Sequence, residues 1–517
     1  MDARTRAPPP GSPAATYRAL VKEAMRPRQK RIYVLAWIIT YAALVATLAP
    51  AAPLRSFVVL SSVAVLATTV VPLLLFRRTH LIRAVPPRTL PCVSRASLVA
   101  HLLRADDAWH AVALHAACGA LVAMQCAVLQ VCLRGWSAPL SPMRYIDAHH
   151  AYYVNEAFLS AVSLGTTVGA AYAVAYMLLV PGGRRGVPPF SPTALGTSLR
   201  TRCLGALPRH VLRALMLLVA VPLLLLAYSL ARDTWWAAVL RVVGVETSVR
   251  RFLVPSFRVP YAPGALGLHA LPVITFLLVL FEATHTLFDV YWTQPLCAIP
   301  PRLNDPLTAL LGGLHDPHPF FSAHALAELA HWAQSEPARR HALFEDAGAA
   351  PAAPPTAPTP AALSRASALW RTLGYVVSSL WARMPSEAQH VLFPQTLYSA
   401  LVAPAPALWL DAHLLDDRAR ACWAAQVLQH LVLASLAEDK YGSVQPHVPA
   451  LVPALAQAHE RLMAVRRRAE DMAVEADTHL VREAQLVRRA LAAAGADANA
   501  ATFPPAHGRR MRAWTTK

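Results

Sequence analysis

Charged residues are scarce in this sequence. Charged side chains make up 15% of the 517 residues, apolar side chains make up 56%, and the mean hydropathy is +0.38. A soluble protein usually has about 25% charged residues, so too few are present here to cover the surface of an ordinary globular enzyme. The composition therefore predicts that part of the chain is surrounded by lipid.

Acidic residues are scarcest in the first part of the chain, which explains the formal net charge of +19. Residues 1–289 contain 28 Lys and Arg against 10 Asp and Glu, whereas residues 290–517 contain 20 against 19. A nucleic-acid-binding protein gathers its basic residues on one soluble surface, but here the excess lies between apolar stretches. This distribution predicts no direct contact with nucleic acid.

Catalytic and metal-binding motifs are also lacking. None of the seven cysteines forms a C-x-x-C pair, and no H-E-x-x-H, P-loop or G-x-S-x-G sequence occurs. His101 and Asp106 have the spacing used by some membrane acyltransferases, but a chain with 21 histidines is expected to contain such a pair by chance. We therefore predict a protein that is not an enzyme, with no catalytic residue, no cofactor and no metal site.

Long apolar stretches are what the sequence does contain. Six of them are each long and apolar enough to cross, as a helix, a hydrocarbon core about 30 Å thick. They cover residues 32–50, 56–76, 108–133, 157–180, 214–231 and 267–288. The predicted fold class is all-α, a polytopic membrane protein with six transmembrane helices followed by an α-helical cytoplasmic domain.

Basic residues outside these stretches predict the orientation. Six crossings place both termini on one side of the membrane, and that side carries 20 Lys and Arg against 8 on the other. Cytoplasmic loops are enriched in basic residues, so we predict cytoplasmic N- and C-termini. The opposite loop at residues 232–266 contains Trp235 and Trp236 and is predicted to include a short amphipathic segment resting on the membrane.

The predicted domain organisation follows these changes in composition. It comprises a basic cytoplasmic N-terminal segment (1–31), the transmembrane domain (32–289), a helical cytoplasmic domain in two parts (290–346 and 363–500) separated by an Ala/Pro-rich disordered loop (347–362), and a basic tail (501–517). Asp305 is expected to cap a cytoplasmic helix. Further helices are expected near residues 322–334, 363–381, 422–436 and 455–491.

Three ionisable residues share one face of the last apolar stretch. They are Glu282, His285 and Asp289, at spacings of three and four. Ionisable groups within a span are functional candidates, and a transport or metal interpretation would make Glu282 and His285 ligands. We favour the alternative that the helix leaves the membrane here and that these groups lie at headgroup depth beside Tyr291 and Trp292.

Four segments occur in the order found in a known family. They are HTLFDVYWTQP at residues 285–295, LNDPLTALLGGL at 303–314, HALAELAHWAQSEPARRHALFED at 324–346 and SLAEDKYGSVQPHVPALV at 435–452. Together with the spans, they resemble the family of the transmembrane nucleoporin called nuclear division cycle protein one. Its pattern includes an arginine block, RR-x-x-(apolar)-F, and an EDKYG-x-V-Q block, and the second of these is the most specific match.

The resemblance implies a multi-pass protein of the nuclear envelope, at the pore membrane. Such proteins anchor the nuclear pore complex, assist its insertion and, in fungi, help to insert the spindle pole body. The implied partners are scaffold and linker nucleoporins, other pore-membrane proteins, spindle pole body components and the lipid bilayer. The alternative function is a polytopic lipid enzyme, acyltransferase-like, or a transporter that uses His101 and Asp106 or Glu282 and His285.

The arginine block has a docking and a structural interpretation. Arg339 and Arg340 would form ion pairs with an acidic partner, or they would cap the preceding helix and pair with Glu336. Phe344 is expected to lie in the core.

The EDKYG block has the same two interpretations. Glu438 and Asp439 are expected to end a helix, and Lys440 would interact favourably with the dipole of that helix. Gly442 suits a left-handed C-cap, which a side chain would disfavour, while Tyr441 is the residue to test for exposure. A structural corner explains the block at least as well as a docking site does.

Overall fold

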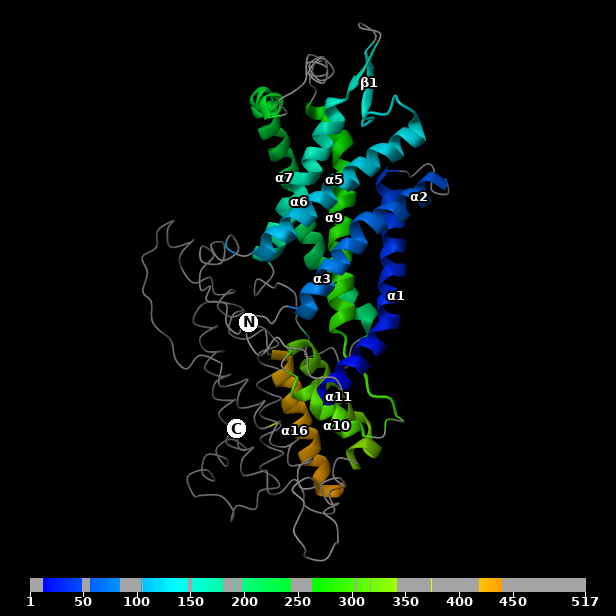
Figure 1. Cartoon of the computed structure of the whole chain (residues 1–517), viewed down its shortest axis with the longest axis vertical. Coiled ribbons are helices and arrows are strands. Elements are labelled where there is room, and N and C mark those ends of the chain that lie inside the picture. Colours follow the sequence, from blue (N-terminus) through cyan, green and yellow to red (C-terminus); the bar gives the residue numbers. More distant parts are fainter. Residues whose placement is uncertain are drawn as a thin grey trace, which may run out of the picture.

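The computed structural model contains a tall helical bundle with a shorter group of helices at one end (Figure 1). It describes residues 13–48, 56–83, 104, 106–146, 151–179, 190, 198–242, 263–301, 303, 305–316, 318–341, 373 and 418–438. The shorter group, called the helical domain below, contains α10 (Pro306–Leu314), α11 (Pro319–Ser335) and α16 (Arg418–Glu438).

The bundle is built from long apolar helices. They are α1 (Pro13–Leu48), α2 (Ser56–Val65), α3 (Val71–Arg83), α5 (Asp106–Arg134), α6 (Glu156–Leu179), α7 (Leu199–Val242) and α9 (Pro263–Thr293). Within the described residues, five stretches are long and apolar enough to cross a membrane: Thr16–Leu48, Ser56–Thr79, Ala108–Arg134, Glu156–Ala175 and Gly267–Thr293. They coincide with five of the six predicted spans. The sixth, at residues 214–231, lies within α7 and remains a prediction.

The second span changes its hydrogen-bonding pattern halfway along. A π-helical turn, Leu66–Val70, joins α2 to α3. Pro72 lies two residues after the end of this turn and has no amide hydrogen to donate to the carbonyl four residues earlier. A widened turn is a common way for a helix to accommodate such a defect. In the same region the amide of Gln125 on α5 donates a hydrogen bond to Thr68 Oγ1 at 2.8 Å.

Helices α5 and α6 pack closely because three glycines lie between them. A Cβ atom on Gly165 would lie 2.6 Å from the carbonyl oxygen of Gly119, and a Cβ atom on Gly119 would meet the carbonyl of Gly165. Gly169 lies in the same way against the backbone of His115. Small residues that bring two backbones together are a common means of helix association in membranes.

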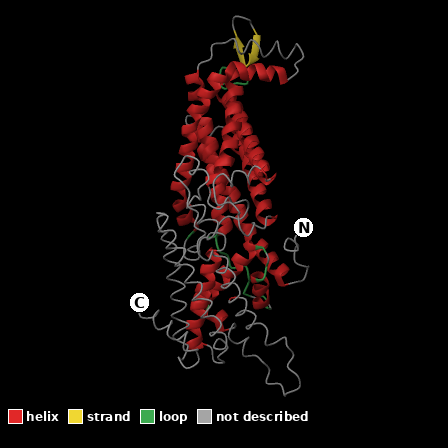
Figure 2. Ribbon diagram, turned by 90° about the vertical axis from the view of Figure 1, so that its left-hand side faces the viewer, coloured by secondary structure: helices red, strands yellow, loops and turns green. Residues whose placement is uncertain are grey.

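A short antiparallel hairpin connects α5 and α6, at the end of the bundle away from the helical domain (Figure 2). Strand β1 (Met143–Ile146) pairs with β2 (Ala151–Val154), and Met143 lies opposite Val154. Tyrosine and β-branched residues favour this conformation. The hairpin was not predicted, but the described chain is otherwise helical, as the all-α class requires.

Helix α1 begins well before the first predicted span. It runs without interruption from Pro13, so residues 13–31 of the predicted N-terminal segment continue the span as one helix. Figure 1 shows this part of α1, in dark blue, passing beyond the bundle to reach α10 and α11. The N-terminal segment is therefore part of the contact between the bundle and the helical domain.

Helix α7 extends to Val242, so the first part of the loop predicted at 232–266 is helical. Figure 1 looks along the last turns of α7, and Figure 2, turned by 90°, shows a helix across that end of the bundle. A helix resting on a membrane surface has this orientation. Its membrane contact remains a prediction.

One hydrophobic core extends from the bundle into the helical domain. It includes Phe276 and Phe281 of α9, Trp332 of α11 and Trp423 of α16, all at most 2% exposed. Asp305 caps α10 as expected, because its carboxylate accepts a hydrogen bond from the amide of Thr308 at 3.1 Å. The continuous core means that the helical domain is packed against the spans.

Several predicted features lie outside the described residues. They are the loop at 347–362, the helix at 455–491, the tail at 501–517, and all of 363–500 except Leu373 and residues 418–438.

We expect Gly165→Ala to destabilise the protein, because the new methyl group would force α5 and α6 apart. The free energy of unfolding should fall by about 1–3 kcal/mol, measured as thermal melting of the full-length protein in detergent. Gly205→Ala on α7 is the control, because no atom lies within 4 Å of the new Cβ there. Equal melting temperatures for the two variants would contradict the close packing of α5 and α6.

Candidate functional site

The connection between the bundle and the helical domain, called the junction below, begins at the end of α9. Arg28 of α1 donates hydrogen bonds to the carbonyls of Gln294 at 2.5 Å and Pro295 at 2.8 Å. Arg202 of α7 donates to the side chains of Gln294 at 2.6 Å and Thr293 at 2.7 Å. Two cations therefore bind the carboxyl end of the last span, where carbonyl groups lack helical partners and the helix dipole favours positive charge.

A buried carboxylate holds α1 against α11. The hydroxyl of Tyr17 donates to Glu328 Oε2 at 3.1 Å, and the amide of Ile299 donates to Glu328 Oε1 at 2.9 Å. Burial raises the pKa of the Glu328 carboxyl above its usual value, while these hydrogen bonds oppose the shift. The Tyr17 ring lies on Gly313 of α10, where a Cβ atom would come within 2.5 Å of the ring. Only glycine leaves room for this contact.

A second buried carboxylate, that of Asp316, is bound by the next residue of α1. Arg18 makes a two-pronged ion pair with Asp316, from Nε at 2.5 Å and Nη2 at 2.6 Å. The Asp316 side chain is fully buried and also accepts a hydrogen bond from the amide of His318 at 2.8 Å. The Arg18 guanidinium lies 5.1 Å from the centre of the Phe321 ring. A planar fork facing a carboxylate defines both position and orientation.

Sequence reasoning missed all four of these partners. Tyr17 and Glu328 are 311 positions apart, and Arg18 and Asp316 are 298 positions apart. The basic residues before the first span were interpreted only as a signal of orientation. No local pattern indicates which acidic residue they bind.

A polar network lies inside the bundle, where α3, α5 and α9 meet. Arg77 forms an ion pair with Asp289 at 2.7 Å, and its Nη1 lies 3.2 Å from His285 Nδ1. His285 Nε2 lies 3.1 Å from His115 Nε2, and His115 Nδ1 lies 2.7 Å from the carbonyl of Ala111. We refer to these groups as the bundle network.

One assignment of protons satisfies the whole bundle network. Arg77 donates to His285 Nδ1, the N–H at His285 Nε2 donates to His115 Nε2, and the N–H at His115 Nδ1 donates to Ala111. Both imidazoles are then neutral, and all four ring nitrogens are used. No lone pair is left for a metal ion, which disfavours the interpretation of His285 as a ligand.

Two of the three ionisable residues of the last span, Glu282 and His285, therefore face inward. His285 is 1% exposed and Glu282 is 5% exposed, while Asp289 lies at the edge of the network with Arg77. The structure thus places Glu282 and His285 between helices, while their depth relative to the headgroups stays a prediction. No pattern in the sequence indicates that His115, 170 positions away, is the partner of His285.

The two family blocks are joined to each other. Arg340 binds Glu438 through Nε at 3.1 Å and Nη2 at 2.9 Å, and its Nη1 donates to the carbonyl of Ala333 at 3.0 Å. Arg339 pairs with Glu336 at 2.7 Å and lies over the Trp332 ring. Both arginines thus bind groups of their own chain, as the structural interpretation requires.

The remaining candidates of these blocks, Phe344, Asp439, Lys440, Tyr441 and Gly442, lie outside the described residues. The same is true of His101 and of the side chain of Asp106. Their predicted roles remain predictions.

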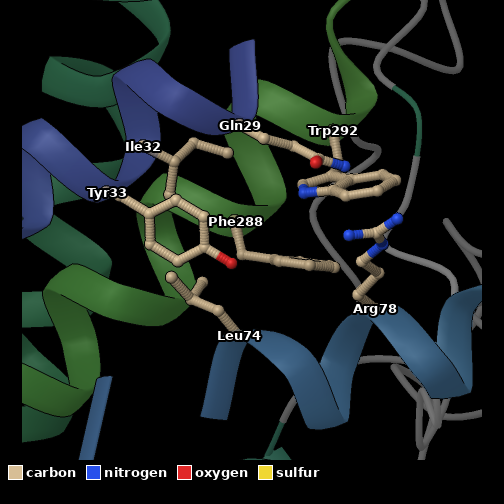
Figure 3. Close-up of a pocket in the computed structure, with 7 residues that line it drawn as sticks. All are labelled: Gln29, Ile32, Tyr33, Leu74, Arg78, Phe288 and Trp292. Atoms are coloured by element: carbon tan, nitrogen blue, oxygen red, sulfur yellow. The ribbon is translucent and has the colours of Figure 1, made fainter. Parts of the chain in front are cut away.

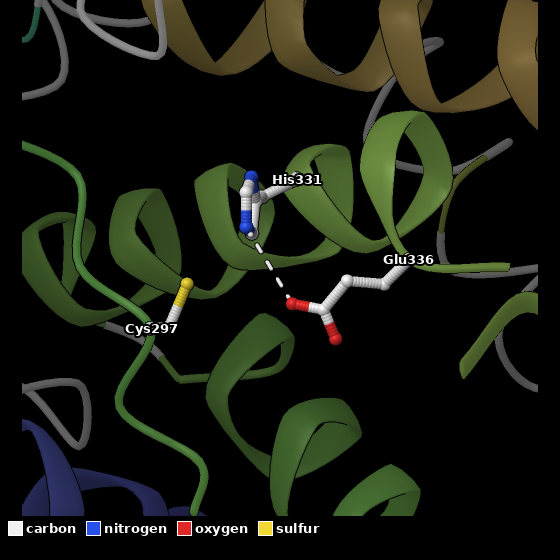
Figure 4. Close-up of side chains that lie close together, drawn as sticks. All are labelled: Cys297, His331 and Glu336. Atoms are coloured by element: carbon white, nitrogen blue, oxygen red, sulfur yellow. Dashed lines mark ion pairs between the residues drawn. The ribbon is translucent and has the colours of Figure 1, made fainter. Parts of the chain in front are cut away.

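Cys297, His331 and Glu336 lie close together beside α11 (Figure 4). Their possible ligand atoms are within 4.8 Å of one another, which is a spacing that could hold a metal ion. Glu336 is already paired with Arg339, however, and this cation beside the cluster would repel a second one. Desolvation and the negative charges of Glu328 and Glu336 raise the pKa of the Cys297 thiol to about 11. These charges fit an ion-pair network better than a metal centre.

Long apolar helices, inward-facing charges that bind one another, and a packed helical domain define a class of protein. This is a polytopic helical membrane protein whose described polar groups are used to hold helices together. The family model described as Nucleoporin protein Ndc1-Nup matches residues 28–352 and 362–494. Because these segments cover most of the chain, the protein belongs to this nucleoporin family, and it is a multi-pass protein of the nuclear envelope or pore membrane. The comparison with curated proteins finds no significant match.

We expect Arg18→Ala to destabilise the protein by about 3–5 kcal/mol, because Asp316 would be left buried without its cation. Thermal melting of the full-length protein measures the loss. Arg26→Ala is the matched control, because Arg26 lies on the same helix but is exposed. Equal melting temperatures for the Arg18 variant and the control would contradict the assigned ion pair.

We expect Arg340→Ala to lower the free energy of unfolding by about 1–3 kcal/mol, because Glu438 loses its charged partner. The free-energy loss in the double variant Arg340→Ala with Glu438→Ala should be smaller than the sum of the losses in the single variants.

The hydrogen bond from Arg340 lowers the pKa of Glu438 below its ordinary 4.5. The pair therefore stabilises the protein above pH 4.5, and its contribution is lost as the pH falls through the lowered value. The difference in the free energy of unfolding between wild type and Arg340→Ala should therefore decrease in acid. A difference that does not change with pH would argue against the ion pair.

Proposed function

We propose that this nucleoporin anchors the nuclear pore complex in the nuclear envelope, supports its assembly and insertion and, in fungi, insertion of the spindle pole body. The observation that carries the proposal is the family match over both the spans and the helical domain. The proposed partners are scaffold and linker nucleoporins, other pore-membrane proteins and spindle pole body components. The protein acts by binding neighbours and carries out no reaction.

The junction supports an anchoring role. Arg18, Arg28 and Tyr17 of α1 attach the helical domain to the same helix that enters the bundle. Because the core is continuous across this contact, a force on the helical domain is passed to the spans through packed side chains. An anchor needs this property, whereas a domain on a loose tether would not have it.

The proposed topology has six spans and both termini on the cytoplasmic side. Helix α7 supports the sixth span because it exposes a stripe of large apolar residues at helical spacing. These residues are Val219, Leu223, Leu226 and Leu230, each more than half exposed. An apolar stripe facing outward is unfavourable in water and favourable in lipid. The excess of basic residues on one side of the spans supports the orientation.

We expect a fluorescently tagged full-length chain to give a punctate nuclear rim that coincides with a scaffold nucleoporin. Protease applied to nuclei with an intact envelope should remove tags at both ends, because both ends would face the cytoplasmic side. His101→Ala with Asp106→Ala is the control for the acyltransferase-like alternative, and it should leave the rim and pore number unchanged. A diffuse plasma-membrane signal, or one protected terminus, would reject the proposal.

A further inference from the structure

A pocket lies between α1, α3 and α9, at the end of the bundle that faces the helical domain. It is a shallow pocket that is open on one side and has little enclosed space. Figure 3 shows the side chains that line it: Gln29, Ile32, Tyr33, Leu74, Arg78, Phe288 and Trp292. Nothing in the junction or the bundle network uses this space.

Three polar side chains at the pocket have no assigned role. Gln29, Tyr33 and Arg78 make no hydrogen bond or ion pair with any residue that the structure describes. Arg77 differs from its neighbour in this respect, because it is paired with Asp289 and lies over the Phe288 ring. The pocket thus presents one cation and two neutral hydrogen-bonding groups, and no carboxylate lines it.

The rest of the lining is apolar and continues onto the outside of the bundle. Ile32, Leu74 and Phe288 form this part of the pocket. The residues that follow two of the lining positions point outward, with Val34 on α1 55% exposed and Leu75 on α3 44% exposed. An apolar group entering the pocket would therefore lie against the same surface that faces lipid.

The location fits the boundary between hydrocarbon and headgroups. The lining residues come from the part of α1 where the predicted apolar stretch 32–50 begins, and from the ends of the second and last spans. Tyrosine and tryptophan are enriched at this depth, as Tyr33 and Trp292 illustrate. Basic pockets between transmembrane helices on the cytoplasmic side bind anionic headgroups, and the sequence predicts most of the basic residues on this side of the spans.

We propose that this pocket binds one anionic phospholipid. Its phosphate accepts charge-assisted hydrogen bonds from Arg78 and hydrogen bonds from Gln29 and Tyr33. One acyl chain lies along Leu74 and continues over the outer surface of the bundle. A soluble phosphate compound would satisfy Arg78 but would leave the apolar part of the pocket empty, so we commit to a lipid. The bound lipid would join three spans directly above the junction.

The test uses the full-length chain in nanodiscs that contain equal amounts of phosphatidylserine and phosphatidylcholine. After transfer to detergent, native mass spectrometry counts the phospholipids that stay bound. The variants are Arg78→Gln, Arg78→Lys, which keeps the charge, and Lys30→Gln. The last is the matched control, because Lys30 is an exposed cation next to Gln29 that does not line the pocket. Thermal melting checks that every variant is folded.

We expect wild type, Arg78→Lys and Lys30→Gln to retain one phosphatidylserine, and Arg78→Gln to retain roughly fivefold less. Equal retention of phosphatidylcholine would overturn the proposal because binding would then be unspecific. An equal loss of phosphatidylserine in Lys30→Gln would also overturn it, because the effect would then be due to net charge alone.

A competition experiment adds soluble glycerophosphoserine. Displacement of the lipid at equal concentration would identify the site as one for soluble phosphate compounds and would also overturn the proposal. If Arg78→Gln fails to fold, Tyr33→Phe with Gln29→Leu replaces it, and unchanged retention in that folded variant counts against the site.

Discussion

Two buried carboxylates, those of Asp316 and Glu328, constrain how the helical domain sits on the bundle. A buried carboxylate is costly unless it is paired or hydrogen-bonded, and here Arg18 and Tyr17 of α1 supply the partners. Moving the helical domain away from α1 would separate Asp316 from Arg18 and Glu328 from Tyr17, and each carboxylate would keep only its hydrogen bond from a backbone amide. Since α1 also enters the membrane bundle, its continuous path links the spans to the helical domain, and the proposed anchoring role depends on this link.

Inside the bundle, the same requirement determines how three spans meet. The proton order from Arg77 through His285 and His115 to a backbone carbonyl leaves no ring nitrogen unused. Sliding one helix past another would break at least one of these contacts in an apolar medium, where a lost hydrogen bond is not replaced by water. The polar groups of the last span therefore define helix register. The close backbone contact at Gly165 defines the register of α5 and α6 through steric fit.

The family motifs contribute first to the fold of the helical domain. Arg340 and Glu438 belong to separate blocks that are 98 positions apart, and they form one ion pair that fastens α16 to the end of α11. In the described part of both blocks, the charged side chains are thus used within the fold.

The sequence by itself determined five spans, the cap at Asp305 and the helical class. These features depend on local properties, because apolar length and the first hydrogen bonds of a helix involve residues close in the chain. Only the tertiary structure decided that Arg18 meets Asp316, that His285 meets His115 and that Arg340 meets Glu438. Charge and hydrophobicity show that such groups need partners. Which partner each one finds depends on how the whole chain folds back on itself.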